Sequence, residues 1–324
     1  MATGGEFLPQ TAVSLSFDPT TGQHDDGLSA FVNLRPRLFG IAYRVVGNAA
    51  EAEDIVQDVW LRWQSTNRKV VENPPAFLAT TTTRLCINLA QSAHTRHETY
   101  VGTWLPEPVD TSSDPGLGAE RSEALKLAVL LLLEKLSPTE RAAYVLREAF
   151  DYSYDQIAAI LQMEEANVRQ LVSRARKHIA DGRRKSVSSN EQRRLLEAFV
   201  TAAQKGDMAA LEGLLAEDVV SYADGGGLVR AAGVPVSGRE RVKTFVEAVS
   251  TYFWKGVSVA FVEVNGQAAV LVSRGGVPAT LGTIDASAQG IDQIMWFLRP
   301  SKLTAVAKSG QDLSEGHAPG PAAA

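Results

Sequence analysis

The segment "YDQIAAILQMEEANVRQLVSRARKHI", Tyr154–Ile179, has the pattern of two helices separated by a tight turn. The apolar spacing predicts a short helix over Tyr154–Leu161, a turn at Gln162-Met163 and a longer helix after it. The turn lacks the glycine that often occupies the position of Gln162. On the longer helix, the residues expected to face inward are Val168, Leu171, Val172 and Ala175. This arrangement is typical of a helix-turn-helix.

The outer face of the longer helix is polar and basic. Residues 164–185 hold seven Lys or Arg and three Asp or Glu, a local charge of +4 (7 − 3) in a chain of formal net charge −5. Such a helix can enter the major groove of DNA, where Arg, Asn and Gln read base edges and Lys or Arg hold phosphates. The alternative is a solvated basic face on a structural helix. The candidate DNA-reading residues are Glu165, Asn167, Arg169, Gln170, Ser173, Arg174, Arg176 and Lys177.

Two helical blocks are expected in the N-terminal half of the chain. In the second block, residues 118–185, "ERSEALKLAVLLLLEKL" predicts an apolar helix, and Ser137, Pro138 and Glu140 form a capping box that opens another. In the first block, residues 28–99, "AEAEDIVQDVWLRWQ" and "NPPAFLATTTTRLCINLAQSAHTRH" both have helical spacing. The second of these ends in a polar, partly basic stretch.

The two blocks are joined by "YVGTWLPEPV", Tyr100–Val109, within a linker over residues 100–117. Pro106 and Pro108 exclude a helix here and stiffen the chain. Yet Trp104 and Leu105 give the segment more apolar surface than a spacer needs. We therefore expect another surface of the protein to cover it.

Beyond "SVSS" at residues 186–189 the pattern changes to an α+β domain over residues 190–308. Two helices broken at Gly206-Asp207 come first, and "SGRERVKTFVEAVSTY" predicts a third. A hairpin is expected around the glycines of "VVSYADGGGLVRAAG", and two strands around Asn265-Gly266, a strong type I′ turn signal. A last strand is expected in "GIDQIMWFL". The prediction is one curved sheet with helices on one face.

Composition sets further bounds on the chain. Its 324 residues allow two or three domains. No apolar run is long enough to span a bilayer, and the N-terminus lacks the pattern of a secretory signal. The single cysteine, Cys86, excludes an internal disulfide and a cysteine-based zinc site. We expect a cytoplasmic protein with no metal, no cofactor, no membrane contact and disordered tails over residues 1–27 and 309–324.

The chain resembles an extracytoplasmic-function (group 4) RNA polymerase sigma factor. "AEDIVQDVWLRW" is similar to the polymerase-binding helix of sigma region 2, and "LSPTERAAYVLREAFDYSYDQIAAIL" with "VRQLVSRARK" is similar to region 4. The rest resembles the ECF41-type subgroup, in which a C-terminal SnoaL-like (NTF2-like) cone domain is fused to the sigma module. That resemblance lies in "YVGTWLPEP", in "DGGG" at Asp224–Gly227 and, loosely, in "RPSKL" at Arg299–Leu303.

The resemblance implies a multidomain fold: two all-α domains, region 2 and region 4, followed by the α+β cone. It also implies core RNA polymerase, through its β′ clamp and β flap, and promoter DNA as partners, with no separate anti-sigma factor required. The implied polymerase-binding residues are Asp54, Gln57, Asp58, Trp60 and Arg62. The implied contacts to the −10 element are Arg84, Asn88, Gln91, His94, Arg96 and His97, while region 4 would read the −35 element.

The resemblance further implies that the C-terminal domain regulates the sigma module through the linker. The implied interdomain residues are Tyr100, Trp104, Leu105, Pro106, Asp224, Gly225, Gly226, Gly227, Pro300, Lys302 and Leu303. Leu228 stands where the subgroup has a lysine after its glycines, so the contacts there are expected to differ. Trp104 packing on region 2 or region 4 alone is the alternative.

A rival hypothesis is a small-molecule-binding or cyclase- or isomerase-like domain tethered to a DNA reader. Acid–base catalysis needs a positioned Asp, Glu or His. Three residues are the candidates for this role. His317, the one histidine after His178, lies in the tail, and Asp224 beside glycines suits a turn. Asp292 could face either side of its strand. We expect no catalytic residues, and a small ligand in the pocket of this domain stays open.

Overall fold

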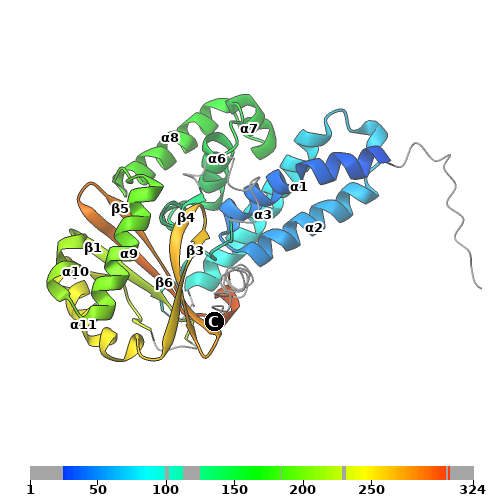
Figure 1. The fold of residues 1–324 in the computed structure, drawn as a ribbon. Helices are drawn as coiled ribbons and strands as arrows, with labels where there is room; N and C mark the ends of the chain where they lie inside the picture. The colour runs from blue at the N-terminus through cyan, green and yellow to red at the C-terminus, as the bar shows by residue number, and fades with distance from the viewer. Residues whose placement is uncertain are drawn as a thin grey trace, which may run out of the picture.

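The computed structural model describes residues 25–98, 102–111, 125–182, 184–227, 231–303 and 306. Two helical domains lie beside a C-terminal domain built on a single sheet (Figure 1). Of the tails expected over residues 1–27 and 309–324, residues 1–24 and 309–324 lie outside the described residues.

The first helical domain holds α1 (Asp25–Val46), α2 (Ala49–Ser65), the 3₁₀ turn η1 (Arg68–Val70) and α3 (Pro74–Glu98). The first helix begins at Asp25, so residues 25–27, expected as part of the N-terminal tail, are helical. Asn48 starts α2 as its N-cap, because its side-chain oxygen accepts a hydrogen bond from the amide of Glu51 at 2.9 Å. Tyr43, Trp63 and Leu78 are fully buried between the three helices.

The second helical domain holds α5 (Leu127–Leu133), α6 (Pro138–Glu148), α7 (Tyr154–Leu161) and α8 (Glu165–Asp181). The expected capping box is present, since the Ser137 hydroxyl accepts from the amide of Glu140 and the Glu140 carboxylate accepts from the amide of Ser137. Gln162 takes the left-handed conformation between α7 and α8, with φ of 55°. The apolar helix α5 is shorter than expected, and residues 112–124 before it lie outside the described part.

The C-terminal domain holds α9 (Ser189–Lys205), α10 (Met208–Leu214), α11 (Arg239–Phe253) and a six-stranded sheet. The strands are β1 (Leu215–Asp224), β2 (Val236–Ser237), β3 (Val257–Val264), β4 (Gln267–Arg274), β5 (Val277–Ser287) and β6 (Gly290–Phe297), and their order is β2-β1-β6-β5-β4-β3. β1 and β6 run parallel, and the other neighbours run antiparallel. Asn265 and Gly266 both have positive φ, as a type I′ turn between β3 and β4 requires.

Two features of the sheet go beyond the strand predictions. The second strand of the hairpin expected at the glycines after Asp224 falls on residues 228–230, which lie outside the described residues; in the described part, β1 pairs with the two-residue β2, which begins at Val236. Strand β5 was not predicted, because Pro278 and Gly282 both weaken a strand pattern.

The sheet separates two apolar cores. Helices α9, α10 and α11 cover one face (Figure 1), where Phe199, Val270 and Ile294 are buried. Side chains of the opposite face, such as Leu271 and Phe297, join a continuous core with the linker and both helical domains. Because successive side chains of a strand point to opposite faces of the sheet, the same strands pack into both cores. None of the described helices is both long and apolar enough to cross a bilayer.

Candidate functional site

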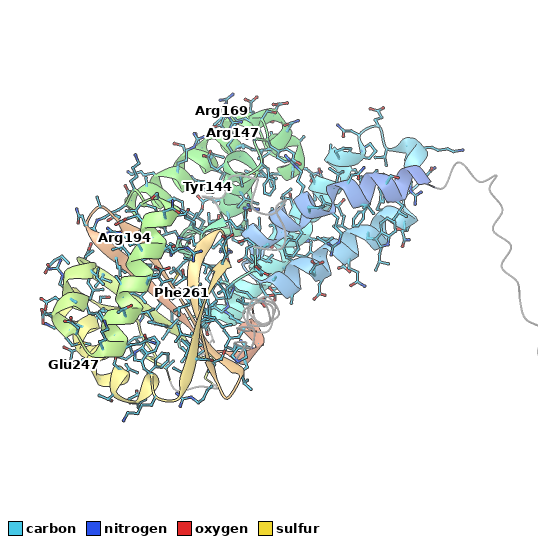
Figure 2. The ribbon with its side chains drawn as sticks, in the orientation of Figure 1. Tyr144, Arg147, Arg169, Arg194, Glu247 and Phe261 are labelled. Atoms are coloured by element: carbon cyan, nitrogen blue, oxygen red, sulfur yellow. The ribbon has the colours of Figure 1, made fainter. Side chains whose placement is uncertain are left out.

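Helix α8 presents the expected polar stripe. Val168, Leu171, Val172 and Ala175 are buried against the rest of the helix-turn-helix, so the opposite face points to solvent. Glu165 is half-buried, and the exposed members of the stripe are Asn167, Arg169, Gln170, Ser173, Arg174, Arg176 and Lys177. Figure 2 shows Arg169 at the end of the molecule opposite Glu247 of α11.

Three arginines of this stripe are paired with carboxylates of the same domain. The Nε of Arg174 donates to Glu140 at 3.0 Å, the Nε of Arg176 donates to Glu148 at 3.0 Å, and Arg169 pairs with Glu165. The three guanidinium side chains are 64%, 49% and 59% exposed. Exposed pairs of this kind contribute about 0–1 kcal/mol, so a DNA phosphate or base edge could displace the carboxylate at little cost.

On α3, Arg84, Asn88 and Gln91 are exposed and lie on one face, since their spacing is i, i+4, i+7. Arg84 already has a partner, because its Nε donates to the carbonyl of Ile160 on α7 at 3.3 Å. The backbone of α3 continues through His94, Arg96 and His97, whose side chains lie outside the described part.

On α2, Asp54, Gln57, Asp58 and Arg62 are exposed along one side of the helix. Leu61 lies among them and is 53% exposed, an apolar side chain in a charged surface that sequence reasoning missed. Trp60, in contrast, is half-buried against the ring of Phe31, with ring centroids 4.8 Å apart. This face thus combines a charged rim with an accessible apolar residue, which is the composition of a protein-binding surface.

The two helical domains contact each other through arginines that cap helix ends. Arg141 donates to the carbonyl of Val45 in the last turn of α1 at 2.8 Å, and Arg37 donates to the carbonyl of Phe150 just after α6 at 2.8 Å. The Arg84 bond to Ile160, in the last turn of α7, is of the same kind. Carbonyls at helix C-termini lack intrahelical partners and attract positive charge, so each arginine joins one domain to the other.

The linker is held by a buried ion pair of the C-terminal domain. Asp224, at the end of β1, accepts hydrogen bonds from the amide of Leu105 at 3.1 Å and from the ammonium of Lys302 at 2.7 Å. Lys302 also donates to the carbonyl of Leu105. Leu105 and Asp224 are fully buried, and we call these three residues the linker clamp. Burial lowers the pKa of Lys302 more than the neighbouring carboxylate raises it.

Trp104 lies between two domains but is only partly buried. Its ring passes close to Gly47, where an added Cβ would meet it at 2.9 Å, and the Lys302 ammonium lies 4.8 Å from its centroid. Trp104 therefore contacts the first helical domain, at the corner between α1 and α2, and the C-terminal domain. Leu105 is more deeply buried than Trp104. Pro106 is buried beside it, while Tyr100 lies outside the described residues.

The linker also docks on the corner between α1 and α2. The amide of Glu107 donates to the carbonyl of Gly47 at 2.8 Å, and its carboxylate accepts from the amide of Ala49 at 3.0 Å. The phenol of Tyr43 donates to the carbonyl of Glu107 at 2.6 Å. Burial raises the pKa of Tyr43, which keeps this donor protonated. Glu107 thus satisfies an amide at the start of α2 as a capping residue would.

Asn265 joins all three domains to the linker. Its side-chain nitrogen donates to the Tyr43 phenol at 2.8 Å and to the carbonyl of Leu125 at 2.9 Å, while its side-chain oxygen accepts from the amide of Val109 at 3.0 Å. Its own amide donates to the carbonyl of Val109, next to a β-bridge between Asp110 and Val264. Asn265 is fully buried. The sequence showed it as a turn residue, and nothing in its spacing indicated partners up to 222 residues away.

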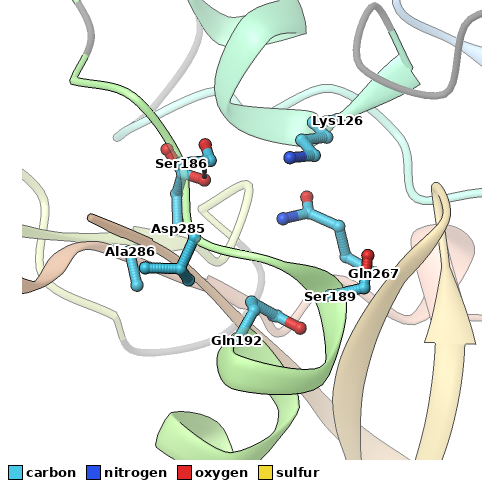
Figure 3. A pocket seen from close by; sticks show the side chains of 8 residues that line it. Lys126, Ser186, Ser189, Gln192, Gln267, Asp285 and Ala286 are labelled. Carbon is cyan, nitrogen blue, oxygen red and sulfur yellow. Dashed lines mark hydrogen bonds between the residues drawn. The ribbon is translucent and has the colours of Figure 1, made fainter. Parts of the chain in front are cut away.

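A third junction ties the end of the second helical domain to the sheet. The Ser186 hydroxyl donates to Asp285 at 3.0 Å in a small pocket that Lys126 and Gln267 also line (Figure 3). Arg184 pairs with Asp218 at 2.7 Å and with Asp292 at 2.6 Å. Asp292, considered above as an acid for catalysis, is therefore part of an interdomain ion pair.

The remaining motif residues divide between backbone and packing roles. Gly226 and Gly227 have φ of 58° and 72°, values that favour glycine, and Gly225 is buried beside Asp224. Leu303 is buried in the core shared with the linker, while Pro300 is exposed.

Comparison with known proteins decides the family. Residues 31–96 match the model described as Sigma-70 region 2, and residues 126–179 match Sigma-70, region 4. The ECF RNA polymerase sigma factor SigJ of Mycobacterium tuberculosis strain H37Rv is 37% identical over 225 residues, which cover 68% of this chain and 72% of SigJ. The chain belongs to the extracytoplasmic-function sigma factors of RNA polymerase.

One further relative and one solved structure extend this finding across the whole architecture. The protein described as "Probable ECF RNA polymerase sigma factor SigI" from M. tuberculosis strain CDC 1551 is 31% identical over 87% of this sigma factor and 96% of its own length. The crystal structure of M. tuberculosis SigJ is similar at a TM-score of 0.70 and 31% identity, covering 86% of this chain and 98% of that one. The fused C-terminal domain fits the ECF41-type subgroup, and these comparisons do not favour the alternative of an enzyme tethered to a DNA reader.

Proposed function

We propose that this sigma factor docks on core RNA polymerase through the exposed face of α2 and directs it to promoters read by α3 and α8. The observation that carries the proposal is that the exposed polar faces of α2, α3 and α8 all lie within the residues that match sigma regions 2 and 4. On α2 the docking face consists of Asp54, Gln57, Asp58, Leu61 and Arg62, with Trp60 supporting it from below. In this role the chain selects the promoter and the polymerase performs the chemistry in the cytoplasm.

Duplex DNA at the −35 element would be read by the stripe on α8. Arg169, Arg174 and Asn167 are long or planar donors suited to base edges, and Arg176 and Lys177 are suited to phosphates. The −10 element would meet Arg84, Asn88 and Gln91 on α3, followed along the helix by His94, Arg96 and His97. A basic groove of this kind holds melted DNA by backbone contacts and base stacking.

The closed arrangement of the two helical domains is proposed as a resting state. Elements named −35 and −10 are roughly 25 base pairs apart, which is about 85 Å of duplex at 3.4 Å per base pair. Two domains in direct contact cannot reach both elements at once. Arg84 also donates a hydrogen bond to α7 in this arrangement, so one residue of the −10 face is already engaged by the other domain. Promoter binding would therefore require the arginine contacts between the domains to open.

The C-terminal domain would hold this resting state through the linker, without a separate anti-sigma factor. The linker clamp and Asn265 both bind linker backbone, and Asn265 additionally binds Tyr43 of region 2 and the start of region 4. The described residues that line the cavity of this domain include no Asp, Glu, His, Lys, Arg or Cys. This lining agrees with a regulatory role for the domain.

The test is runoff transcription by core polymerase programmed with the full-length sigma factor. Replacing Arg169 and Arg174 by Ala should reduce use of a −35/−10 promoter, each by about 1–3 kcal/mol where it makes a good base contact. Arg194→Ala is the matched control, because Arg194 is also an exposed, carboxylate-paired arginine but lies on α9 (Figure 2). Equal loss in the control, or none in the α8 variants across a salt series, would contradict DNA reading by α8.

A further inference from the structure

The C-terminal domain contains a cavity of about 670 Å³ between the sheet and its helices. This volume lies within the range of small-molecule sites, roughly 300–1,000 Å³. Six aromatic side chains dominate its lining: Phe199, Phe245, Tyr252, Phe253, Trp254 and Trp296. The other lining residues are Ala, Val and Leu with the hydroxyls of Ser250 and Thr280.

The aromatic rings form a connected wall. Phe253 meets Trp254 edge-on at 4.7 Å between centroids and Trp296 at 6.1 Å, and Trp296 also contacts Phe199 at 6.2 Å. Gly282 lies opposite Trp296 in the sheet, and a Cβ at Gly282 would overlap the indole. The glycine therefore lets the indole lie close against the sheet, so that the ring does not fill the cavity. Tyr252 lines the cavity and is 63% exposed, so it marks the opening.

We propose that this cavity binds an uncharged, largely apolar ring compound, and that its occupancy controls the linker clamp. The lining offers aromatic faces and a few neutral hydroxyl and indole N–H groups for one or two polar atoms of the ligand. A charged ligand would lose its hydration there without gaining an ionic partner among the described lining residues, which is costly.

The cavity and the linker clamp use opposite faces of the same two strand ends. Ala223 and Trp296 are partners in the β1–β6 register and line the cavity, while the next pair, Asp224 and Phe297, faces the linker core. The amide of Leu298, another lining residue, donates to the carbonyl of Asp224 at 2.9 Å. A ligand that shifts Trp296 or Leu298 will thus move the backbone of the residue that holds Leu105. This regulatory step rests on the proposed function; the binding step does not.

Binding is tested on the full chain with N-phenyl-1-naphthylamine, a neutral apolar fluorophore. We expect saturable binding of one equivalent, with energy transfer from tryptophan, because Trp254 and Trp296 line the cavity. Ala203→Trp on α9 and Val249→Trp on α11 fill the cavity from two sides and should each weaken binding at least tenfold, whereas Glu247→Ala on the outer face of α11 should not. Absence of saturable binding to the wild type, or wild-type affinity in a folded filling variant, would overturn the site. Equally tight binding of the anionic analogue 1-anilinonaphthalene-8-sulfonate would overturn the ligand class.

Coupling is tested by hydrogen exchange of the Leu105 amide with and without saturating fluorophore. A change of at least threefold, absent in the two filling variants, is expected if the cavity controls the clamp. Unchanged exchange at saturation would overturn the coupling. Promoter activity of the same protein is measured separately by runoff transcription, so failure of the sigma function and failure of this inference give different results.

Discussion

Lys302 and Asp224 form a charged pair in an environment that disfavours charge. Burial lowers the pKa of Lys302 even though Asp224 lies at hydrogen-bond distance, so the charged lysine is held there at a cost in folding free energy. Buried pairs of this type often contribute little net stability but are strongly disruptive when only one partner is removed. We infer that the pair fixes the position of Leu105 more than it stabilises the fold.

A double-mutant cycle tests this inference. Lys302→Met and Asp224→Asn are each expected to destabilise the docked linker by about 3–5 kcal/mol, because each leaves a buried group without its partner. The double variant should cost markedly less than the sum of the two. Protection of the Leu105 amide from hydrogen exchange measures the docked state directly, and additive single effects would argue against a coupled pair.

Asn265→Gly is expected to loosen all three domains around the linker. Glycine retains the left-handed conformation that Asn265 adopts, with φ of 53°, so the change isolates the side chain. The phenol of Tyr43, the carbonyl of Leu125 and the amide of Val109 each lose a buried partner, at about 1–3 kcal/mol per group left unsatisfied. Faster exchange of the Val109 amide is the expected result, and wild-type protection would show that the turn backbone alone holds the linker. Gly275→Ala, in the open turn between β4 and β5, is the control for a turn change away from the linker.

At the scale of single residues, predictability from sequence depended on the distance between partners along the chain. The capping box at Ser137 has both partners within four positions, and the structure contains it. Asn265 bonds residues 140, 156 and 222 positions away, and no local pattern reports such contacts. The Asp224 and Lys302 positions were identified through the family resemblance and not from their chemistry.

Among the helices, the turn of the helix-turn-helix carries strain that can be relieved. Gln162 occupies left-handed space, which costs a non-glycine residue about 1–2 kcal/mol. Gln162→Gly should remove this cost, but glycine also increases the conformational entropy of the unfolded chain, which lowers stability. We therefore expect only a slight rise in the thermal unfolding temperature. Gln162→Val should lower it, since a β-branched residue is least tolerant of positive φ. The opposite order would contradict the assigned turn geometry.

Helices were predicted more reliably than strands. Apolar spacing and caps located α2, α3, α6, α7 and α8, whereas strand β5 carries Pro278 and Gly282 and has buried residues on both faces over much of its length. Its central segment packs into both cores, so the polar–apolar alternation of a half-exposed strand is absent. The strand expected directly after the glycines falls on residues outside the described part, and the pairing of β1 with β2 gave no sequence signal because β2 has only two residues.

For the whole molecule, we predict that the contacts between the domains and access to the promoter are mutually exclusive. The arginine caps between the helical domains, the linker clamp and Asn265 all act in the closed arrangement. Binding of α2 to the polymerase must offset their loss. Variants that weaken the clamp should therefore bind core polymerase more readily, and this effect should not require the DNA-reading face of α8.

The most direct measurement is energy transfer between dyes on the two helical domains. Glu72→Cys and Ala180→Cys provide exposed labelling sites, and the native Cys86 is buried, with burial raising the pKa of its thiol, so it should label poorly. We predict efficient transfer in the free protein and a large loss of transfer when core polymerase and promoter DNA are added. Asn265→Gly should shift the free protein part of the way toward the low-transfer state. Unchanged transfer in the promoter complex would contradict the claim that the closed arrangement opens for promoter recognition.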